Sequence, residues 1–235
     1  MNSLNVTTTM PKRNPIPSSI LSLDEALEGG LGEGEILHIF GPGGVGKTTL
    51  AIQFVINTAQ RGNRVFYINL EGKFPLIRLR QMTSSQFSQI SPLITIVSPA
   101  NFKEQTKLVS NLDSILSPEV KLLVFDTIVS HYRREYGPTT DNVMLNRKLN
   151  QQFGLIASAA RSSNFAVIAL NQVRGDIDNE TNFLPVAESV TSYWGTYHLQ
   201  IMRAESKGYR EFKLTKRDNS ESKILIAHLQ LAGFR

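Results

Sequence analysis

The residues best suited to chemistry form one run, Gly41-Pro-Gly-Gly-Val-Gly-Lys-Thr48, which fits the spacing G-x-x-x-x-G-K-[ST]. Glycines let the backbone turn sharply and direct a row of N–H donors at an anion. A helical pattern follows at Thr49–Gln60, and the N-terminus of a helix favours negative charge at the same place. The motif therefore predicts a nucleotide-phosphate site formed by Gly41, Pro42, Gly43, Gly44, Val45, Gly46, Lys47, Thr48 and Thr49.

A phosphate site of this kind needs a cation for the phosphates and ligands for a metal ion. Lys47 is expected to reach the β- and γ-phosphates, and the Thr48 hydroxyl is expected to bind Mg²⁺. Asp126 follows the apolar strand expected at Lys121–Phe125, and the carboxyl ends of parallel strands face the ligand crevice. We therefore expect ATP and Mg²⁺ as cofactors, with Thr48 and Asp126 on the metal; the alternative for Asp126 is a simple turn cap.

Two further side chains are expected at the same edge of the sheet. Glu71 follows the strand at Arg64–Leu70 and could orient or deprotonate the attacking water. Gln172 follows the strand at Phe165–Leu170 and could hydrogen-bond the γ-phosphate. Their plainer alternatives are a solvent-facing turn acid and a capping amide. With Lys47 and Asp126, these two residues complete the predicted catalytic set.

The elements that must position these residues alternate between strand and helix patterns. Their strands are apolar without alternation, which predicts an α/β fold with a mostly parallel sheet covered by helices on both faces. After Gln172 the strand–helix alternation gives way to strands joined by short polar turns. This pattern predicts an antiparallel extension at one edge of the sheet. The expected strands are 35–40, 64–70, 93–97, 121–125, 165–170, 197–202, 210–214 and 223–229, and the expected helices 49–60, 75–85, 103–116 and 142–162.

Length and composition set the remaining limits. The 235 residues suit one large domain, expected at 18–235, preceded by a polar, proline-containing flexible arm at 1–17. The absence of cysteine excludes disulfides and thiolate nucleophiles and suits a cytoplasmic protein. No apolar run approaches the roughly 18 residues of a spanning helix, so no membrane association is expected. A net charge of +5 fits nucleic-acid binding, or an ordinary soluble protein with a small excess of lysine and arginine.

The order of these motifs resembles the RecA/RadA recombinase superfamily, and within it the archaeal RadB group. The resemblance rests on the phosphate motif, Glu71-Gly72 after the next strand, Asp126 and Asn171-Gln172-Val173, and it spans roughly 18–235. It implies a RecA-like P-loop NTPase fold. It also implies a weak ATPase that binds single- or double-stranded DNA in homologous recombination and repair. Its expected partners are a main recombinase of the RadA type and other copies of the same chain.

The resemblance also assigns roles to single residues. Glu71 matches the catalytic glutamate, Asp126 the Walker B acid and Gln172 the γ-phosphate sensor, while Arg78 falls where the family stacks an arginine on adenine. Lys216 and Arg217 fall where basic residues reach the γ-phosphate of a neighbouring subunit, like an arginine finger. The alternative for Arg78 is an ordinary surface arginine, and the alternative for Lys216 and Arg217 is a solvated turn.

Two segments, 130–141 and 174–193, lie where recombinases carry their DNA-binding loops. The first segment combines cations with aromatic rings, which suits phosphate contacts and base stacking. The alternative is a solvated loop whose aromatic rings fold onto the core. The residues expected to contact DNA are Tyr132, Arg133, Arg134, Tyr136 and Arg174.

The sequence also departs from the family pattern. The Phe-x-x-Ala motif with which recombinases polymerise is absent from Met1–Ser18, and Asp176, Asp178 and Glu180 follow Arg174-Gly175. Two other functions therefore stay open. One is a KaiC-like regulatory ATPase that does not bind DNA, and the other is a nucleotide-gated protein-binding module. A comparison of DNA binding with and without ATP would separate the recombination protein from the KaiC-like alternative.

Overall fold

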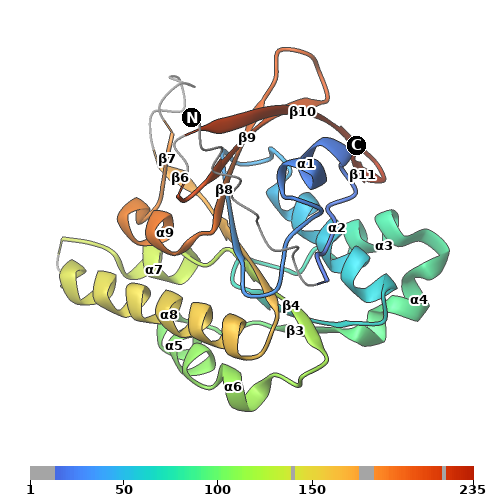
Figure 1. Cartoon of the computed structure of the whole chain (residues 1–235). Helices are drawn as coiled ribbons and strands as arrows, with labels where there is room; N and C mark the ends of the chain where they lie inside the picture. Colours follow the sequence, from blue (N-terminus) through green and yellow to red (C-terminus); the bar gives the residue numbers. More distant parts are fainter. Residues whose placement is uncertain (1–13, 139–140, 175–182, 219–220) are drawn as a thin grey trace, which may run out of the picture.

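A twisted nine-stranded sheet forms the centre of the described structure (Figure 1). The structure is a computed structural model that describes residues 14–138, 141–174, 183–218 and 221–235. The strand order is β11-β10-β9-β8-β1-β5-β4-β2-β3. The strands of this sheet are β1 (Ile36–Phe40), β2 (Arg64–Asn69), β3 (Ile94–Val97), β4 (Val120–Asp126), β5 (Ala166–Asn171), β8 (Tyr197–Arg203), β9 (Tyr209–Lys216), β10 (Ser222–Gln230) and β11 (Gly233–Phe234).

The sheet is parallel from β3 through β8 and antiparallel from β8 to β11. This confirms the predicted parallel sheet with an antiparallel extension. A separate two-stranded ribbon pairs β6 (Val173–Arg174) with β7 (Leu184–Pro185) in antiparallel fashion. The short strands β6, β7 and β11 were not expected from the sequence.

Helices cover both faces of the sheet, as Figure 1 shows. One apolar core lies under α1 and α2, and a second lies under α5 to α9. Strand side chains alternate between the two cores: in β2, Val65 and Tyr67 belong to the first, and Phe66 and Ile68 to the second. The helices are α1 (Leu21–Ala26), α2 (Lys47–Gln60), α3 (Leu76–Thr83), α4 (Phe87–Ile90), α5 (Phe102–Ser110), α6 (Leu112–Ile115), α7 (Ser130–Glu135), α8 (Asn142–Ser162) and α9 (Glu188–Trp194).

The structure differs from the sequence-based expectations at three places. The single helix expected at 103–116 is divided into α5 and α6 at Asn111, which has non-helical backbone angles. The segment expected as the first DNA loop begins with helix α7. The folded core also begins before residue 18, because Ile16 is buried and bridges Leu31 through two backbone hydrogen bonds. Residues 1–13 of the expected arm lie outside the described residues.

Candidate nucleotide site and adjoining surface

The carboxyl ends of β1, β2, β4 and β5 meet at a hollow of about 640 Å³. This volume is within the roughly 300–1,000 Å³ that is usual for small-molecule sites. The hollow is lined by glycines of the phosphate motif and by Lys47, Thr48, Thr49, Glu71, Asp126, Thr127, Gln172, Val173 and Leu229. The four predicted catalytic side chains are therefore brought together by the fold.

The phosphate loop is held in a conformation that requires glycine. Gly46 has a φ of 107° and precedes the first residue of α2. A side chain on Gly41 would place its Cβ atom 2.2 Å from the carbonyl oxygen of Ile201, so only glycine fits there. The Lys47 ammonium donates to the carbonyl oxygens of Gly41 and Pro42, both at 2.8 Å. Burial lowers the pKa of Lys47, and the carboxylates of Glu71 and Asp126 oppose this shift.

Asp126 lies at the centre of a buried hydrogen-bond network and is 6% exposed. It accepts a hydrogen bond from Thr48 Oγ1 at 3.1 Å and another from Tyr67 Oη at 2.6 Å. Burial raises the pKa of Asp126; the bonds from Tyr67 and Thr48 lower it, Glu71 raises it and Lys47 lowers it. The two side-chain oxygens of Thr48 and Asp126 are the ligand type that Mg²⁺ prefers, so the residues present fit this metal.

Sequence reasoning missed Tyr67. The ring is buried within β2. Its hydroxyl donates a hydrogen bond to Asp126 that is shorter than the one from Thr48. A tyrosine in an otherwise apolar stretch of a central strand was the available signal, because a buried hydroxyl normally has a polar partner.

Glu71 and Gln172 are directly bonded at the mouth of the hollow. Gln172 Nε2 donates to Glu71 Oε1, and Thr127 Oγ1 donates to the other carboxylate oxygen at 3.3 Å. Glu71 is exposed to solvent, so its carboxylate is accessible to a water molecule. The structure thus places a carboxylate that follows β2 and an amide that follows β5 beside the phosphate loop.

A second network joins the segment around Val186 to the end of β5, at Asn171 and Gln172. Asn171 Nδ2 contacts His38 Nε2 at 3.1 Å and donates to the carbonyl oxygen of Val186 at 2.9 Å. Burial lowers the pKa of His38 to about 3, so the ring is neutral and Nε2 can accept. The backbone N–H of Val186 donates to the carbonyl oxygen of Gln172 at 3.0 Å.

Arg78 lies beside the phosphate loop but is engaged by the C-terminal strands. Its guanidinium donates to the carbonyl oxygens of Gln230 and Leu231 at 2.9 and 2.8 Å, and Nε reaches Thr49 Oγ1 at 3.3 Å. The position is next to the predicted nucleotide site. Stacking of Arg78 on adenine stays a prediction.

The C-terminal strand β11 packs against the phosphate loop, a contact that the sequence did not reveal. Gln53, in α2, accepts from the Phe234 N–H at 2.6 Å and donates to the Phe234 carbonyl oxygen at 3.1 Å. The Phe234 ring packs against the phosphate loop so closely that a Cβ on Gly46 would lie 2.6 Å from Cζ. Because 181 residues separate Gln53 from Phe234, no local pattern could indicate this contact.

The residues expected to contact DNA divide into exposed and buried groups. Arg133, Arg134 and Tyr136 are exposed, with Tyr136 at 52%. Tyr132 is only 4% exposed, and its hydroxyl donates to Asn146 Oδ1 at 2.8 Å. The expectation that Tyr132 stacks on a base is therefore wrong, because helix α7 turns this ring onto the core. For this residue the alternative of an aromatic ring folded onto the core is confirmed.

The second segment expected to bind DNA is described only in part. Arg174 ends β6 and is exposed, and α9 follows β7. Residues 175–182, with Asp176, Asp178 and Glu180, lie outside the described residues, as do 139 and 140 of the first segment.

Lys216 and Arg217 lie toward the amino end of β1, whereas the phosphate loop follows its carboxyl end. Lys216 pairs with Tyr197, which pairs with Leu37 near the start of β1, whereas the phosphate loop follows the end of β1. Lys216 Nζ forms an ion pair with Glu28 at 3.0 Å, and Arg217 donates to the carbonyl oxygen of Tyr193 at 3.3 Å. Neither side chain can reach the phosphate site of its own chain.

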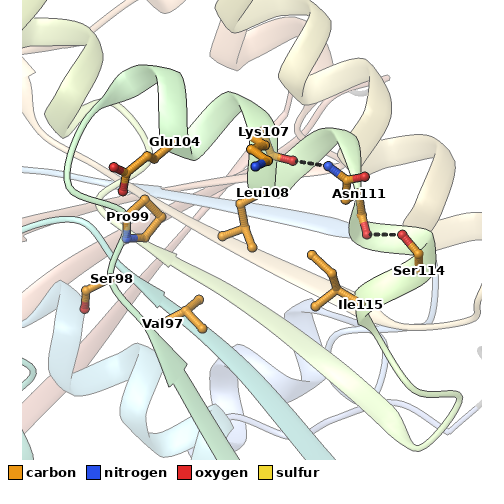
Figure 2. A pocket seen from close by; sticks show the side chains of 9 residues that line it. All are labelled: Val97, Ser98, Pro99, Glu104, Lys107, Leu108, Asn111, Ser114 and Ile115. Carbon is orange, nitrogen blue, oxygen red and sulfur yellow. Dashed lines mark hydrogen bonds between the residues drawn. The ribbon is translucent and has the colours of Figure 1, made fainter.

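A separate hollow of about 540 Å³ lies where β3 ends beside α5 and α6. Figure 2 shows that Val97, Leu108 and Ile115 point into it, with Glu104 and Asn111 at its rim. Asn111 donates to the carbonyl oxygen of Lys107 at 2.7 Å and accepts from Ser114 through its own carbonyl oxygen at 3.0 Å. None of the predicted site residues lines this hollow.

The model of the Rad51 family matches residues 16–210. The chain belongs to the Rad51 family. It is 34% identical over 198 residues to the DNA repair and recombination protein RadB of Thermococcus gammatolerans, covering 83% of this chain and 86% of that protein. It is 30% identical over 186 residues to the RadB protein of Methanosphaera stadtmanae, covering 78% of this chain and 79% of that protein.

A solved structure agrees with this assignment to the Rad51 family. The crystal structure of the RadB recombinase superposes with a TM-score of 0.76 at 28% identity, covering 93% of this chain and 98% of that one. The resemblance to recombinases and to the RadB group, and the RecA-like fold, are thus confirmed. Among the helices that the structure describes, none is both long and apolar enough to cross a membrane.

Proposed function

We propose that this Rad51-family chain is an ATP-dependent DNA-binding protein of homologous recombination and repair, with slow ATPase activity. The observation that carries the proposal is the meeting of Lys47, Thr48, Asp126, Glu71 and Gln172 at one hollow. Relatives named DNA repair and recombination protein RadB support the biological role. The match to this family favours recombination over a KaiC-like regulator or a nucleotide-gated binding module.

Each residue of the hollow has a physical role in this proposal. The N–H groups of the phosphate loop and the Lys47 ammonium would hold the triphosphate, replacing the two carbonyl contacts that Lys47 makes. Thr48 and Asp126 would hold Mg²⁺, which when bound neutralises charge on the phosphates. Glu71 would accept the proton of the attacking water, and Gln172 would orient that carboxylate through their hydrogen bond.

DNA would bind beside this hollow, on the surface that carries Arg133, Arg134, Tyr136 and Arg174. Gln172 would also hydrogen-bond the γ-phosphate, and it is two residues from Arg174 in the chain. This gives a short route from the γ-phosphate to the bound DNA. We further propose that a RadA-type recombinase is a partner and that copies of the chain associate.

Lys47→Ala tests the nucleotide site. Loss of the ammonium should abolish ATP binding or turnover, while circular dichroism and the melting temperature show that the fold survives. Arg161→Ala, at the far end of α8, is the matched control because it removes an exposed cation away from the hollow. Normal hydrolysis by the Lys47 variant would mean that the site is wrongly assigned.

A salt titration of DNA affinity tests the binding role. Phosphate contacts release counterions, so affinity for labelled single- and double-stranded DNA should fall steeply with salt. Replacing both Arg133 and Arg134 by alanine should flatten the log–log slope by about two units if both meet phosphate. A wild-type protein that binds no DNA at low salt, with or without ATP, would leave only the ATPase and favour the KaiC-like alternative.

A further inference from the structure

Two histidines on neighbouring strands of the sheet contact each other. His38 of β1 is 1% exposed, and its Nδ1 lies 3.3 Å from Nδ1 of His198 in β8. The two residues are direct partners in the parallel register of these strands. Neither lines the nucleotide hollow, so the pair belongs to the sheet and not to the wall of the site.

Asn171 determines which nitrogen of His38 carries the proton. Asn171 Nδ2 donates to the carbonyl oxygen of Val186 at 2.9 Å and lies 3.1 Å from His38 Nε2. Because an amide nitrogen only donates, His38 Nε2 must accept, and the neutral ring then carries its proton on Nδ1. That N–H donates to Nδ1 of His198, so the proton of the neutral His198 ring is on Nε2.

This relay needs both rings to be neutral. Burial lowers the pKa of His38 to about 3, with a further lowering from His198. Burial also lowers the pKa of His198; the backbone of Ser192 raises it, Arg217 lowers it and the backbone of Gly195 raises it. Within the described residues, Arg217 is the charged group that acts on the pair. Both rings are therefore neutral at neutral pH.

The relay ends on a clamp around Gln172. Val186 accepts from Asn171 through its carbonyl oxygen and donates its N–H to the carbonyl oxygen of Gln172 at 3.0 Å. The side chain of Gln172 donates to Glu71 at the nucleotide hollow. The orientation of the Asn171 amide therefore fixes the backbone from which Gln172 reaches Glu71.

The same groups have a second arrangement, which opens the clamp. Asn171 Oδ1 is buried and has no hydrogen-bond partner among the described residues. If the His38 proton moves to Nε2, two donors face each other, and a half turn of the amide brings Oδ1 to His38. The half turn also removes Nδ2 from the carbonyl oxygen of Val186. The acceptor on His198 prevents this by keeping the His38 proton on Nδ1.

We propose that His38 and His198 are positioning residues for ATP hydrolysis. Their fixed tautomers hold the Asn171 amide on Val186 and thereby hold Gln172 on Glu71. The inference rests on the proposed ATPase function, and it adds two residues that lie outside the nucleotide hollow. It also assigns each ring a proton position, which is measurable without nucleotide.

Long-range proton–nitrogen NMR spectra of the histidine-labelled protein, without nucleotide, test the tautomers. His38 should be in the Nδ1–H form and His198 in the Nε2–H form. The chain has four histidines, so single variants assign the signals. The Nε2–H form of His38 would overturn the relay.

Two substitutions of His198 separate its acceptor from its bulk. His198→Asn keeps an acceptor at the place of Nδ1, and His198→Leu removes it. In His198→Leu, the Val186 N–H should exchange with solvent about 2- to 12-fold faster relative to the Val167 N–H, the factor that roughly 0.5–1.5 kcal/mol for one hydrogen bond gives. The Val167 N–H, bonded to the Glu35 carbonyl oxygen, reports any general loss of stability. His198→Asn should keep the wild-type ratio.

ATP turnover gives the functional result. His198→Leu should lower turnover by up to about 100-fold, the cost of a small misplacement, with ATP affinity unchanged. His198→Asn should restore turnover, and His228→Leu, a matched change in β10, should not alter it.

Equal turnover in the asparagine and leucine variants of His198, or equal acceleration of the Val186 and Val167 amides, would overturn the relay and leave the ATPase intact. A wild-type protein that hydrolyses no ATP would overturn the proposed function and the positioning role together, whichever tautomers are found.

Discussion

At the scale of single residues, Glu71 is held by two hydrogen bonds from residues that follow two different strands. Gln172 and Thr127 each donate to one carboxylate oxygen, so the group is oriented although it is exposed. Glu71→Gln keeps the size and polarity but cannot accept a proton. We expect nearly normal ATP binding and a turnover about 100-fold lower, at the low end of general-base effects.

Single-turnover kinetics with a separate measurement of ATP affinity checks this expectation. Glu119→Gln is a suitable control because Glu119 is an exposed carboxylate that pairs with Arg64. Unchanged turnover in Glu71→Gln would reduce Glu71 to a solvent-facing turn residue.

Tyr67 is expected to set the pH range in which Asp126 is ionised. Burial raises the pKa of Asp126, and the hydrogen bond from Tyr67 is the largest effect that lowers it. Tyr67→Phe removes that bond, so the pKa of Asp126 should rise further and the carboxylate should be lost at a higher pH. Because Mg²⁺ needs the ionised carboxylate, the acid limb of the ATPase pH profile should move to higher pH.

Stopped assays over a pH series measure this limb at saturating Mg²⁺ and ATP. Tyr209→Phe is the control, since Tyr209 stacks on His228 and neither residue lines the hollow. An acid limb that stays in place would show that the Tyr67 hydroxyl does not tune Asp126.

At the scale of elements, regular patterns were predictable from the sequence and local interruptions were not. Apolar residues at helical spacing place α8 at 142–162, as found. The break at Asn111 was missed because the apolar pattern continues across it, although asparagine readily leaves helical angles. Helix α7 was missed because its polar, basic sequence looks like a loop, and its buried face includes Tyr132.

The C-terminal strand β11 should support the phosphate loop. Phe234 is buried and packs on Phe212 and against Gly46. Phe234→Ala should lower the free energy of unfolding by about 3–5 kcal/mol, the usual cost of removing a buried phenylalanine ring, and should weaken ATP binding. Chemical denaturation and nucleotide titration measure the two effects.

A double variant separates a steric contact from a general loss of stability. Gly46→Ala alone should be strongly destabilising, because its Cβ would meet the Phe234 ring and its φ is 107°. Adding Phe234→Ala should cost less in the Gly46→Ala background than in the wild type, since the clash is gone. Strict additivity of the two changes would show that the ring does not bear on the loop.

At the scale of the whole molecule, the sequence could place the catalytic residues because a topological rule locates them. Glu71, Asp126 and Gln172 each follow a parallel strand, and the ends of such strands face one crevice. No comparable rule joins Gln53 to Phe234, or Arg78 to Leu231, because those contacts depend on how distant segments pack. Those contacts therefore required the structure.

The position of Lys216 and Arg217 makes catalysis across subunits the last prediction. Lys216 is level with Leu37 in the sheet, and Gly41 is four residues farther along, or about 13 Å at the rise of a strand. A role at the γ-phosphate therefore requires the nucleotide of another copy, and the Lys216–Glu28 ion pair must open. ATPase activity per subunit should then rise with protein concentration. Lys216→Ala/Arg217→Ala subunits mixed with Lys47→Ala subunits should recover activity, because each kind supplies what the other lacks. Turnover independent of concentration, by a protein that ultracentrifugation shows to be monomeric, would remove the trans-acting role and leave both residues as a solvated turn.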